Sequence, residues 1–242
     1  MKDWQKYLAE VFGTFTLVFV GSLSLVGVFQ APNLGAGGQV IVPFAFGLAL
    51  LAGLYAFGEV SGGHFNPAVS LAMFLDRRLA PADLVSYWAS QIIGAVLASL
   101  VVLLAFTKQD VANTATTHSS TKTALVIEIA LTAIFVLVIL QVTRSDGFGS
   151  TALVAIPLTL VAIHFAAVPF SGASVNPARS FAPALVGHVW SGFWVYVVGP
   201  LAGAVLGWVV HTVVARGDLS FGRASSQAGS EPEPEPAASP ES

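Results

Sequence analysis

Two copies of one polar motif interrupt an otherwise apolar sequence. The stretch "SGGHFNPAVSLA" begins at residue 61, and "SGASVNPARSFA" begins at residue 171. Each contains Asn-Pro-Ala, first as Asn66, Pro67 and Ala68 and again as Asn176, Pro177 and Ala178. Asparagine is favoured as a helix cap and proline as the first helical residue, so each motif predicts the start of a helix. The asparagines could be helix caps alone, but the repetition favours side-chain amides that donate hydrogen bonds to a solute.

Four further charged or titratable residues lie in or beside apolar stretches: Glu10, Glu128, His164 and Arg179. Buried acids in a membrane protein usually suggest an ion or proton path. Glu10 and Glu128 occupy corresponding positions in two similar stretches, which favours a structural role as acceptors for backbone N–H groups of bent loops. Arg179 could be an interfacial cation whose stem lies along apolar surface. Its place directly after the second motif favours a functional site instead.

The composition puts these residues in a membrane protein. Of 242 residues, 55% are hydrophobic and 10% are charged, whereas about a quarter are charged in a typical soluble domain. A helix needs about 20 apolar residues to span a bilayer. We expect six spans, at about 7–28, 39–58, 82–106, 123–143, 150–170 and 190–215. The absence of cysteine excludes a disulfide and a thiolate metal site, and no nucleophile–base pair or metal-ligand cluster indicates an enzyme.

The positions of lysine and arginine predict the orientation. With the amino terminus inside, seven of these residues fall on the inner face and three on the outer face. The positive-inside rule then places both termini in the cytoplasm, and we expect a multi-pass protein of the plasma (inner) membrane. Residues 217–242 are acidic, rich in proline and poor in apolar area, and are predicted to form a disordered cytoplasmic tail.

An internal repeat divides residues 1–216 into halves of about 1–107 and 120–216. "SQIIGAVLA" from residue 90 matches "GPLAGAVLG" from residue 199, and "AEVFGTFTLVFV" resembles "IEIALTAIFVLV". Each half holds three spans, so the second half is inverted relative to the first. The helices after Pro67 and after Pro177, the second shorter still, are too short to span and are predicted to be re-entrant half-helices. The predicted fold is all-α, with six transmembrane helices and two half-helices whose motifs meet near the bilayer centre.

The loops before the half-helices are predicted to line a pore. Irregular backbone survives at membrane depth only where it is buried in protein or lines a wet cavity. Their carbonyls then form a row of acceptors, contributed by Gly62, Gly63, His64, Phe65, Ser171, Gly172, Ala173, Ser174 and Val175. We expect His64 to contribute its carbonyl and not its imidazole, and Glu59 to be a solvated charge at a mouth. Two helix amino termini add about half a positive charge each, which disfavours cations and accepts a neutral solute.

The two Asn-Pro-Ala motifs at this spacing, with Arg179 after the second, resemble those of the aquaporins, the major intrinsic protein family. The resemblance extends over about residues 5 to 216. It implies six spans in membrane lipid, inverted halves, two half-helices and a homotetramer with one pore in each subunit. It further implies a passive channel for water that excludes protons and ions, with no cofactor, metal or nucleic acid.

The resemblance also implies a narrow filter of four residues, counted from the motifs: Phe46, His164, Ala173 and Arg179. Phenylalanine and histidine with arginine resemble the water-selective branch, of prokaryotic type, in which histidine is a bulky hydrogen-bond donor. Glycerol channels of the family usually carry an aromatic residue and a glycine at the first two positions and an aspartate in place of Ser180. Ala173 departs from the usual threonine or cysteine, and Val197 from a frequent tryptophan.

Three other functions fit part of the pattern. An aquaglyceroporin-like channel would pass glycerol or other small neutral solutes through the same architecture. A secondary transporter also uses inverted repeats and broken helices, but the sequence holds no separate cluster of ionisable groups to couple an ion gradient. A structural membrane protein would conduct nothing.

Overall fold

The chain folds into long membrane-crossing helices, as seen in a computed structural model that describes residues 2–34, 36–118, 120–144 and 149–216. Among these residues, six helices are long and apolar enough to cross a membrane. They are α1 (Asp3–Gln30), α2 (Ala36–Ser61), α4 (Pro81–Ala105), α6 (Thr121–Val142), α7 (Ser150–Ser171) and α9 (Val195–Arg216). No strand occurs in the described residues. The prediction of an all-α fold with six apolar spans is confirmed, and the predicted tail, 217–242, lies outside the described residues.

The two half-helices are α3 (Pro67–Leu75) and α8 (Pro177–Gly187), each beginning at a motif proline. The prediction that the second is shorter is wrong, because α8 has 11 residues and α3 has 9. α8 continues through Pro183, which removes one intrahelical hydrogen bond but remains in a buried helix. It ends at Gly187 and is capped by His188, which adopts a left-handed conformation.

Two more differences concern the connections. α9 begins at Val195 and not near residue 190, because the preceding residues form a turn in which Gly192 has a φ of +68°. A short helix that the sequence did not predict, α5 (Lys108–Asn113), follows α4 and is capped by Thr107. A 3₁₀ helix, η1 (Pro32–Leu34), joins α1 to α2.

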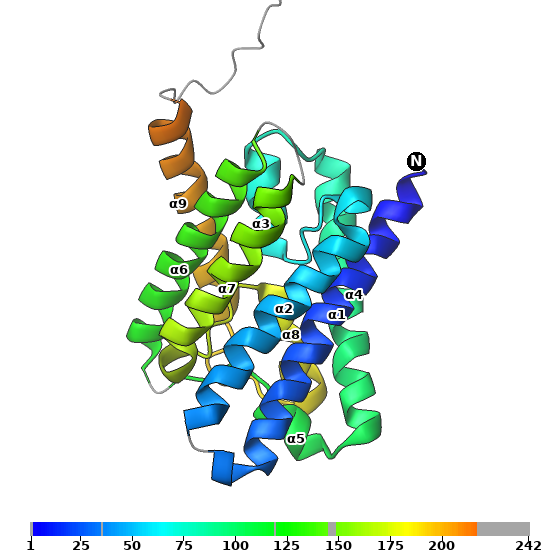
Figure 1. The fold of residues 1–242 in the computed structure, drawn as a ribbon, viewed down its shortest axis with the longest axis vertical. Helices are drawn as coiled ribbons and strands as arrows, with labels where there is room; N and C mark the ends of the chain where they lie inside the picture. Colours follow the sequence, from blue (N-terminus) through cyan, green and yellow to red (C-terminus); the bar gives the residue numbers. More distant parts are fainter. Residues whose placement is uncertain (1, 35, 119, 145–148, 217–242) are drawn as a thin grey trace, which may run out of the picture.

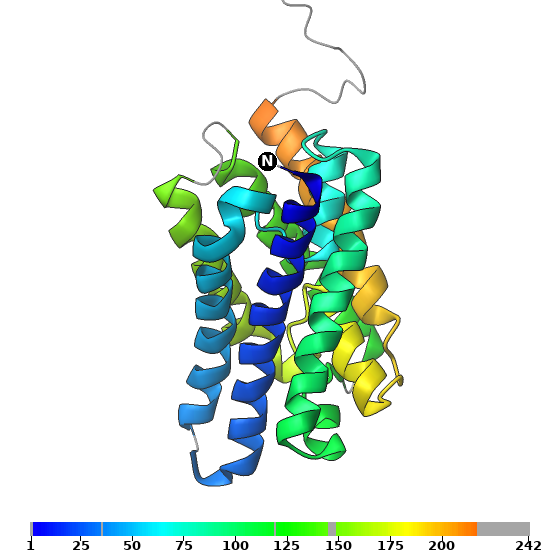
Figure 2. The ribbon, with the colours of Figure 1, turned by 90° about the vertical axis from the view of Figure 1, so that its right-hand side faces the viewer.

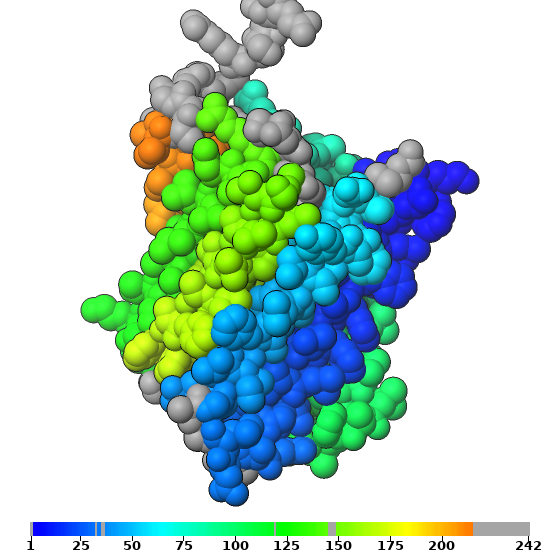
Figure 3. Space-filling view, viewed as in Figure 1, coloured from blue at the N-terminus to red at the C-terminus, as the bar shows by residue number. Residues whose placement is uncertain are grey.

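The helices pack in a pattern that recurs between the two halves. α1 packs against α2 and α4, and α6 packs in the same way against α7 and α9. α2 packs against α7 and joins the halves, while α3 packs against α9 and α8 against α4. Each half-helix therefore packs against a long helix of the other repeat half. Side chains of α1, α2, α6 and α7 cover the face seen in Figure 3.

Glycine allows the helix pairs of each half to approach closely. A Cβ atom on Gly94 of α4 would come within 2.1 Å of the Val11 carbonyl oxygen of α1. A Cβ atom on Gly203 of α9 would come within 2.5 Å of the Ile129 carbonyl oxygen of α6. Both glycines lie in the small-residue stretches that repeat between the halves, so a side chain at either position would push the helices apart.

The two ends of the described chain lie at the same end of the molecule. α1 begins and α9 finishes there (Figure 1), and the view from the side agrees (Figure 2). α3 occupies the half of the molecule nearest to these ends, and α8 occupies the opposite half. The amino termini of the two half-helices therefore meet between the two ends of the bundle.

Candidate functional site

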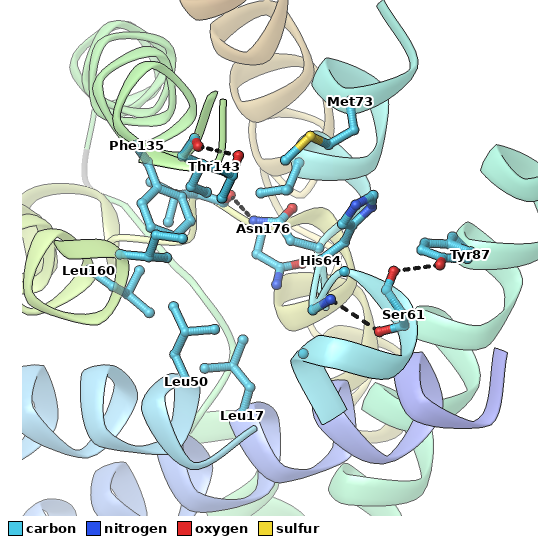
Figure 4. A pocket seen from close by; sticks show the side chains of 18 of the residues that line it. Leu17, Leu50, Ser61, His64, Met73, Tyr87, Phe135, Thr143, Leu160 and Asn176 are labelled. Atoms are coloured by element: carbon cyan, nitrogen blue, oxygen red, sulfur yellow. Dashed lines mark hydrogen bonds between the residues drawn. The ribbon is translucent and has the colours of Figure 1, made fainter. Parts of the chain in front are cut away.

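A cavity of about 700 Å³ extends along the inside of the helix bundle. One wall is apolar and comes from the long helices, with Leu17, Leu50, Phe135, Ile139 and Leu160. The opposite wall is polar and comes from the motif loops, with Gly62, Gly63, His64, Asn66, Ser174, Val175 and Asn176. Figure 4 shows His64 and Asn176 facing Leu17, Leu50 and Leu160 across this space. Between the motif asparagines and this apolar wall, a solute therefore meets hydrogen-bonding groups on one side only.

The motif asparagines cap the half-helices, as their sequence context predicts. The Asn66 side-chain oxygen accepts a hydrogen bond from the Ala68 backbone N–H at 2.9 Å. The Asn176 side-chain oxygen accepts from the N–H groups of Ala178 and Arg179, at 3.0 and 3.2 Å. Because these bonds fix the oxygens on the backbone, the NH₂ groups point away from their own helices.

The NH₂ groups of the two asparagines connect the motif loops to each other. Asn66 Nδ2 donates to the Val175 carbonyl at 2.7 Å, and Asn176 Nδ2 donates to the Phe65 carbonyl at 2.9 Å. Each NH₂ group carries a second hydrogen, and both asparagines line the cavity. The arrangement can therefore present two donors to one solute atom at the middle of the cavity.

The Glu10 carboxylate is hydrogen-bonded to the first motif loop. Its carboxylate accepts from the Ser61 hydroxyl at 2.7 Å and from the backbone N–H groups of His64 and Phe65 at 2.9 and 2.7 Å. The Gln91 amide donates to the same carboxylate at 2.7 Å. Glu10 is fully buried, and its oxygens are saturated by these donors.

Glu128 makes the same contacts to the second motif loop. Its carboxylate accepts from the Ser171 hydroxyl and the Ser174 N–H at 2.8 Å each, and from the Val175 N–H at 2.7 Å. Sequence reasoning found both acids but not the hydroxyl donors that bind them. The signal for those donors was the serine that opens both motifs.

These carboxylates stabilise an unfavourable backbone. Phe65 and Val175, the residues before the two motif asparagines, have φ values of +47° and +43°. Ala173 also has a φ of +47°. A non-glycine residue in such a conformation costs about 1–3 kcal/mol and persists only where its surroundings enforce it. The N–H groups of Phe65 and Val175 are the ones that the two glutamates bind.

Three of the four predicted filter residues meet at one end of the cavity. The rings of Phe46 and His164 stack, with centroids 4.4 Å apart. The guanidinium carbon of Arg179 lies 5.0 Å from the centre of the Phe46 ring. All three are buried and line the cavity. Ala173 is buried in the adjoining loop, outside the lining of this cavity.

The hydrogen bond of His164 determines which ring nitrogen carries a proton. Nδ1 lies 2.9 Å from the Leu160 carbonyl, and a carbonyl can only accept, so Nδ1 donates. Nε2 has no partner among the described residues. In the neutral ring this nitrogen is an acceptor. The sequence predicts that His164 donates a hydrogen bond to the solute. In the structure its N–H proton is used in the bond to Leu160 within α7, so the nitrogen left for the solute is an acceptor.

Arg179 is held by a segment that the sequence did not point to. Its Nη1 donates to the Thr114 carbonyl at 3.2 Å, directly after α5. Within the described part of the chain the guanidinium forms no ion pair, and its Nε has no partner. Arg179 therefore brings a positive charge without a direct ion-pair partner, and an unpaired Nε–H donor, to the end of the cavity.

The other end of the cavity is a charged mouth. Glu59 is exposed there, in line with its expected place at a mouth, and Arg78 donates to the Thr143 carbonyl at 2.8 Å. The ring of His64 also lines the cavity, and its Nδ1 lies 3.1 Å from the Ser70 hydroxyl. The ring turns toward Ser70 of α3, and the expectation that His64 contributes its carbonyl and not its imidazole stays a prediction.

The predicted row of carbonyls is divided. Gly62, Gly63, His64, Ser174 and Val175 belong to the cavity lining, whereas Phe65, Ser171, Gly172 and Ala173 do not. Two carbonyls of the row, those of Phe65 and Val175, accept from the motif asparagines. A carbonyl oxygen has two lone pairs, so this pairing still leaves one acceptor site on each.

Comparisons with known proteins converge on one family. The profile described as "Major intrinsic protein" matches residues 1–211. The chain is 40% identical over 210 residues to the glycerol uptake facilitator protein-like 6 of Lactiplantibacillus plantarum, covering 84% of this chain and 94% of the relative. It is 39% identical over 218 residues to aquaporin Z of Brucella melitensis, covering 85% and 95%.

A solved structure shares the fold. The X-ray structure of the aquaglyceroporin from Plasmodium falciparum matches with a TM-score of 0.78, covering 88% of this chain and 97% of that one. The two sequences are 23% identical. At this identity the likeness concerns the fold.

Proposed function

The chain belongs to the major intrinsic protein family, and we propose that it is a passive membrane channel selective for water. One pore runs through each chain, along the cavity between the apolar wall and the motif loops. The single observation that carries this proposal is the meeting of Phe46, His164 and Arg179 at one end of the cavity.

Those three residues offer what one water molecule needs at a constriction. Arg179 supplies donors and the His164 Nε2 supplies an acceptor, while the Phe46 ring is an apolar wall without a hydrogen-bonding group. Water both donates and accepts within a single small molecule. A larger polyol has to displace the stacked rings to pass. Ala173 is the fourth member of this filter by resemblance to the family.

At the middle of the pore the two asparagines act together. The remaining hydrogens of the Asn66 and Asn176 amides donate to one water oxygen. These two bonds occupy both lone pairs of that water oxygen, so the water cannot accept a hydrogen bond from its neighbour in the file. The apolar wall opposite offers it no other polar partner. The hydrogen-bonded chain that would relay protons is thereby interrupted. The charge of Arg179 and the two half-helix amino termini repel cations.

Glycerol is the second candidate permeant. The observation that favours it is the 40% identity to a protein whose name describes glycerol uptake. The bulky His164 and Ser180, in place of the glycine and aspartate usual in glycerol channels, favour water. We further propose a homotetramer in the plasma membrane with both termini in the cytoplasm. The two described chain ends at the same end of the molecule support both termini lying on one side of the membrane.

Water flux across the membrane of proteoliposomes tests the channel mechanism. Purified protein is reconstituted in phosphatidylcholine vesicles, and osmotic shrinkage is followed by stopped-flow light scattering. A channel gives passive flux that is proportional to the osmotic gradient and independent of ion gradients. Saturable flux that requires a sodium or proton gradient would support a transporter, and flux equal to that of empty vesicles would support a structural protein.

A further inference from the structure

The two half-helices close a gap in the ring of long helices. α4 packs against α3 and α8, and α9 also packs against α3 and α8, so the half-helices lie between α4 and α9. On this side the structure contains a second cavity of about 200 Å³, which shares no lining residue with the main cavity. We name it the rear crevice. It is lined by Pro67, Trp88, Ile92, Pro177, Ala178, Phe181, Phe193, Val197 and Leu201.

The side chains of the rear crevice offer hydrocarbon surface alone. The one polar group among them, the indole N–H of Trp88, already donates to the Pro67 carbonyl at 3.0 Å. A buried water needs two to four polar partners, and these side chains supply none. The chemistry of the crevice therefore selects an apolar occupant.

The depth of the rear crevice identifies that occupant. Pro67 and Pro177 are the first residues of half-helices that run toward opposite ends of the bundle. The crevice consequently lies near the middle of the six apolar spans, in the hydrocarbon core of a bilayer. Its rim is open, since Ile92 is 37% exposed. At that depth in a bilayer, lipid chains surround any part of the surface that no other protein chain covers.

We infer that the rear crevice binds the methyl end of a lipid acyl chain. Its volume of about 200 Å³ equals the space of roughly seven waters at about 30 Å³ each, which suits a short stretch of chain and excludes a whole lipid. The methyl end of the acyl chain then contacts the first Asn-Pro-Ala motif on the side that faces away from the pore. Asn66 lines the main cavity, and the next residue, Pro67, lines the rear crevice.

Photolabelling in a bilayer tests this site. The full-length protein is reconstituted in phosphatidylcholine vesicles that contain a phosphatidylcholine with a diazirine near the methyl end of one chain. After irradiation, labelled residues are identified by mass spectrometry. We expect several-fold more label on crevice residues Ile92 and Val197 than on Leu97 and Val205, which are exposed on the same two helices outside the crevice. A diazirine near the chain carbonyl should remove this enrichment.

A variant that fills the crevice provides the matched control. Val197→Phe should lower the label on Ile92 and leave that on Leu97 and Val205 unchanged. Leu201→Phe, which fills the crevice from the same helix, replaces it if the first variant fails to fold. Equal labelling of crevice and control residues in the unmodified protein overturns the inference. So does enrichment that a folded filling variant keeps, or crosslinking of crevice residues to a second copy of the chain.

Discussion

The rings of Phe46 and His164 stack at 24° between their planes, one contributed by α2 and the other by α7. The same two helices carry a second aromatic pair on the outside of the bundle. Phe44 and Phe165 are exposed, and their ring centroids lie 5.7 Å apart. The inner pair lines the cavity and the outer pair does not. The contact between α2 and α7 thus contains an inner aromatic pair, which is a candidate filter, and an outer aromatic pair, which can serve as its control.

Removal of the inner pair should admit glycerol. In Phe46→Ala/His164→Ala the narrow end loses both rings, and we expect glycerol permeability to rise about tenfold or more, equivalent to about 1.4 kcal/mol of barrier, with water flux retained. Light scattering under a glycerol gradient measures this change. Phe44→Ala/Phe165→Ala likewise removes two aromatic rings, from the outer face, and should leave glycerol permeability unchanged. Unaltered glycerol flux in a folded inner-pair variant would remove Phe46 and His164 from the filter.

Loss of a supporting carboxylate should destabilise the protein. Glu10→Gln replaces an oxygen acceptor by a donor beside the His64 and Phe65 N–H groups, which leaves at least one buried donor unpaired at about 1–3 kcal/mol. Glu128→Gln should act in the same way on the second loop. Thermal unfolding in detergent, followed by tryptophan fluorescence, should show a lower Tm for both, whereas exposed Glu59→Gln should melt like the parent. An unchanged Tm with altered proton flux would indicate a proton path instead.

Removal of the filter charge should open the pore to cations. In Arg179→Ala the positive charge is lost while the half-helix and its asparagine cap remain. We expect water flux to persist and a proton leak to appear, measured with a pH-sensitive dye inside proteoliposomes. Lys122→Ala removes an exposed charge from the start of α6 and should give no leak. A proton-tight Arg179→Ala vesicle would assign the barrier to other groups.

Mercury tests the fourth filter position. The chain has no cysteine, so mercuric chloride should leave water flux of the parent protein unchanged. We expect Ala173→Cys to conduct, to be blocked by mercuric chloride and to recover with a reducing thiol, because its thiol would stand beside Arg179. Ala173 is buried and outside the cavity lining. A labelled variant that still conducts would therefore mean that Ala173 packs behind the loop.

Local signals in the sequence were enough to predict the six spans and the starts of both half-helices. The apolar lengths gave the six spans, and Asn66-Pro67 and Asn176-Pro177 marked the starts of α3 and α8, because caps act within one turn. The relative length of the half-helices was predicted wrongly, because α8 extends to Gly187 and has 11 residues against 9 in α3. α5 was missed because it is short and not apolar.

The contacts of the site could be predicted only where the repeat revealed them. Glu10 and Glu128 were found because their positions correspond in the two halves. The partners of the filter residues could not be found in this way. Thr114 binds Arg179 across 65 positions of sequence, and no periodicity encodes which carbonyl a guanidinium contacts. The stacking of Phe46 on His164 likewise depends on how α2 packs against α7.

Water and glycerol permeabilities of the unmodified protein, measured side by side in the same proteoliposomes, test the proposed selectivity most directly. Stopped-flow light scattering follows shrinkage under an impermeant osmolyte and re-swelling under a glycerol gradient, with protein-free vesicles as the baseline. We expect water permeability well above the baseline and glycerol permeability equal to it. Glycerol permeability raised together with that of water would contradict a water-selective filter of Phe46, His164 and Arg179.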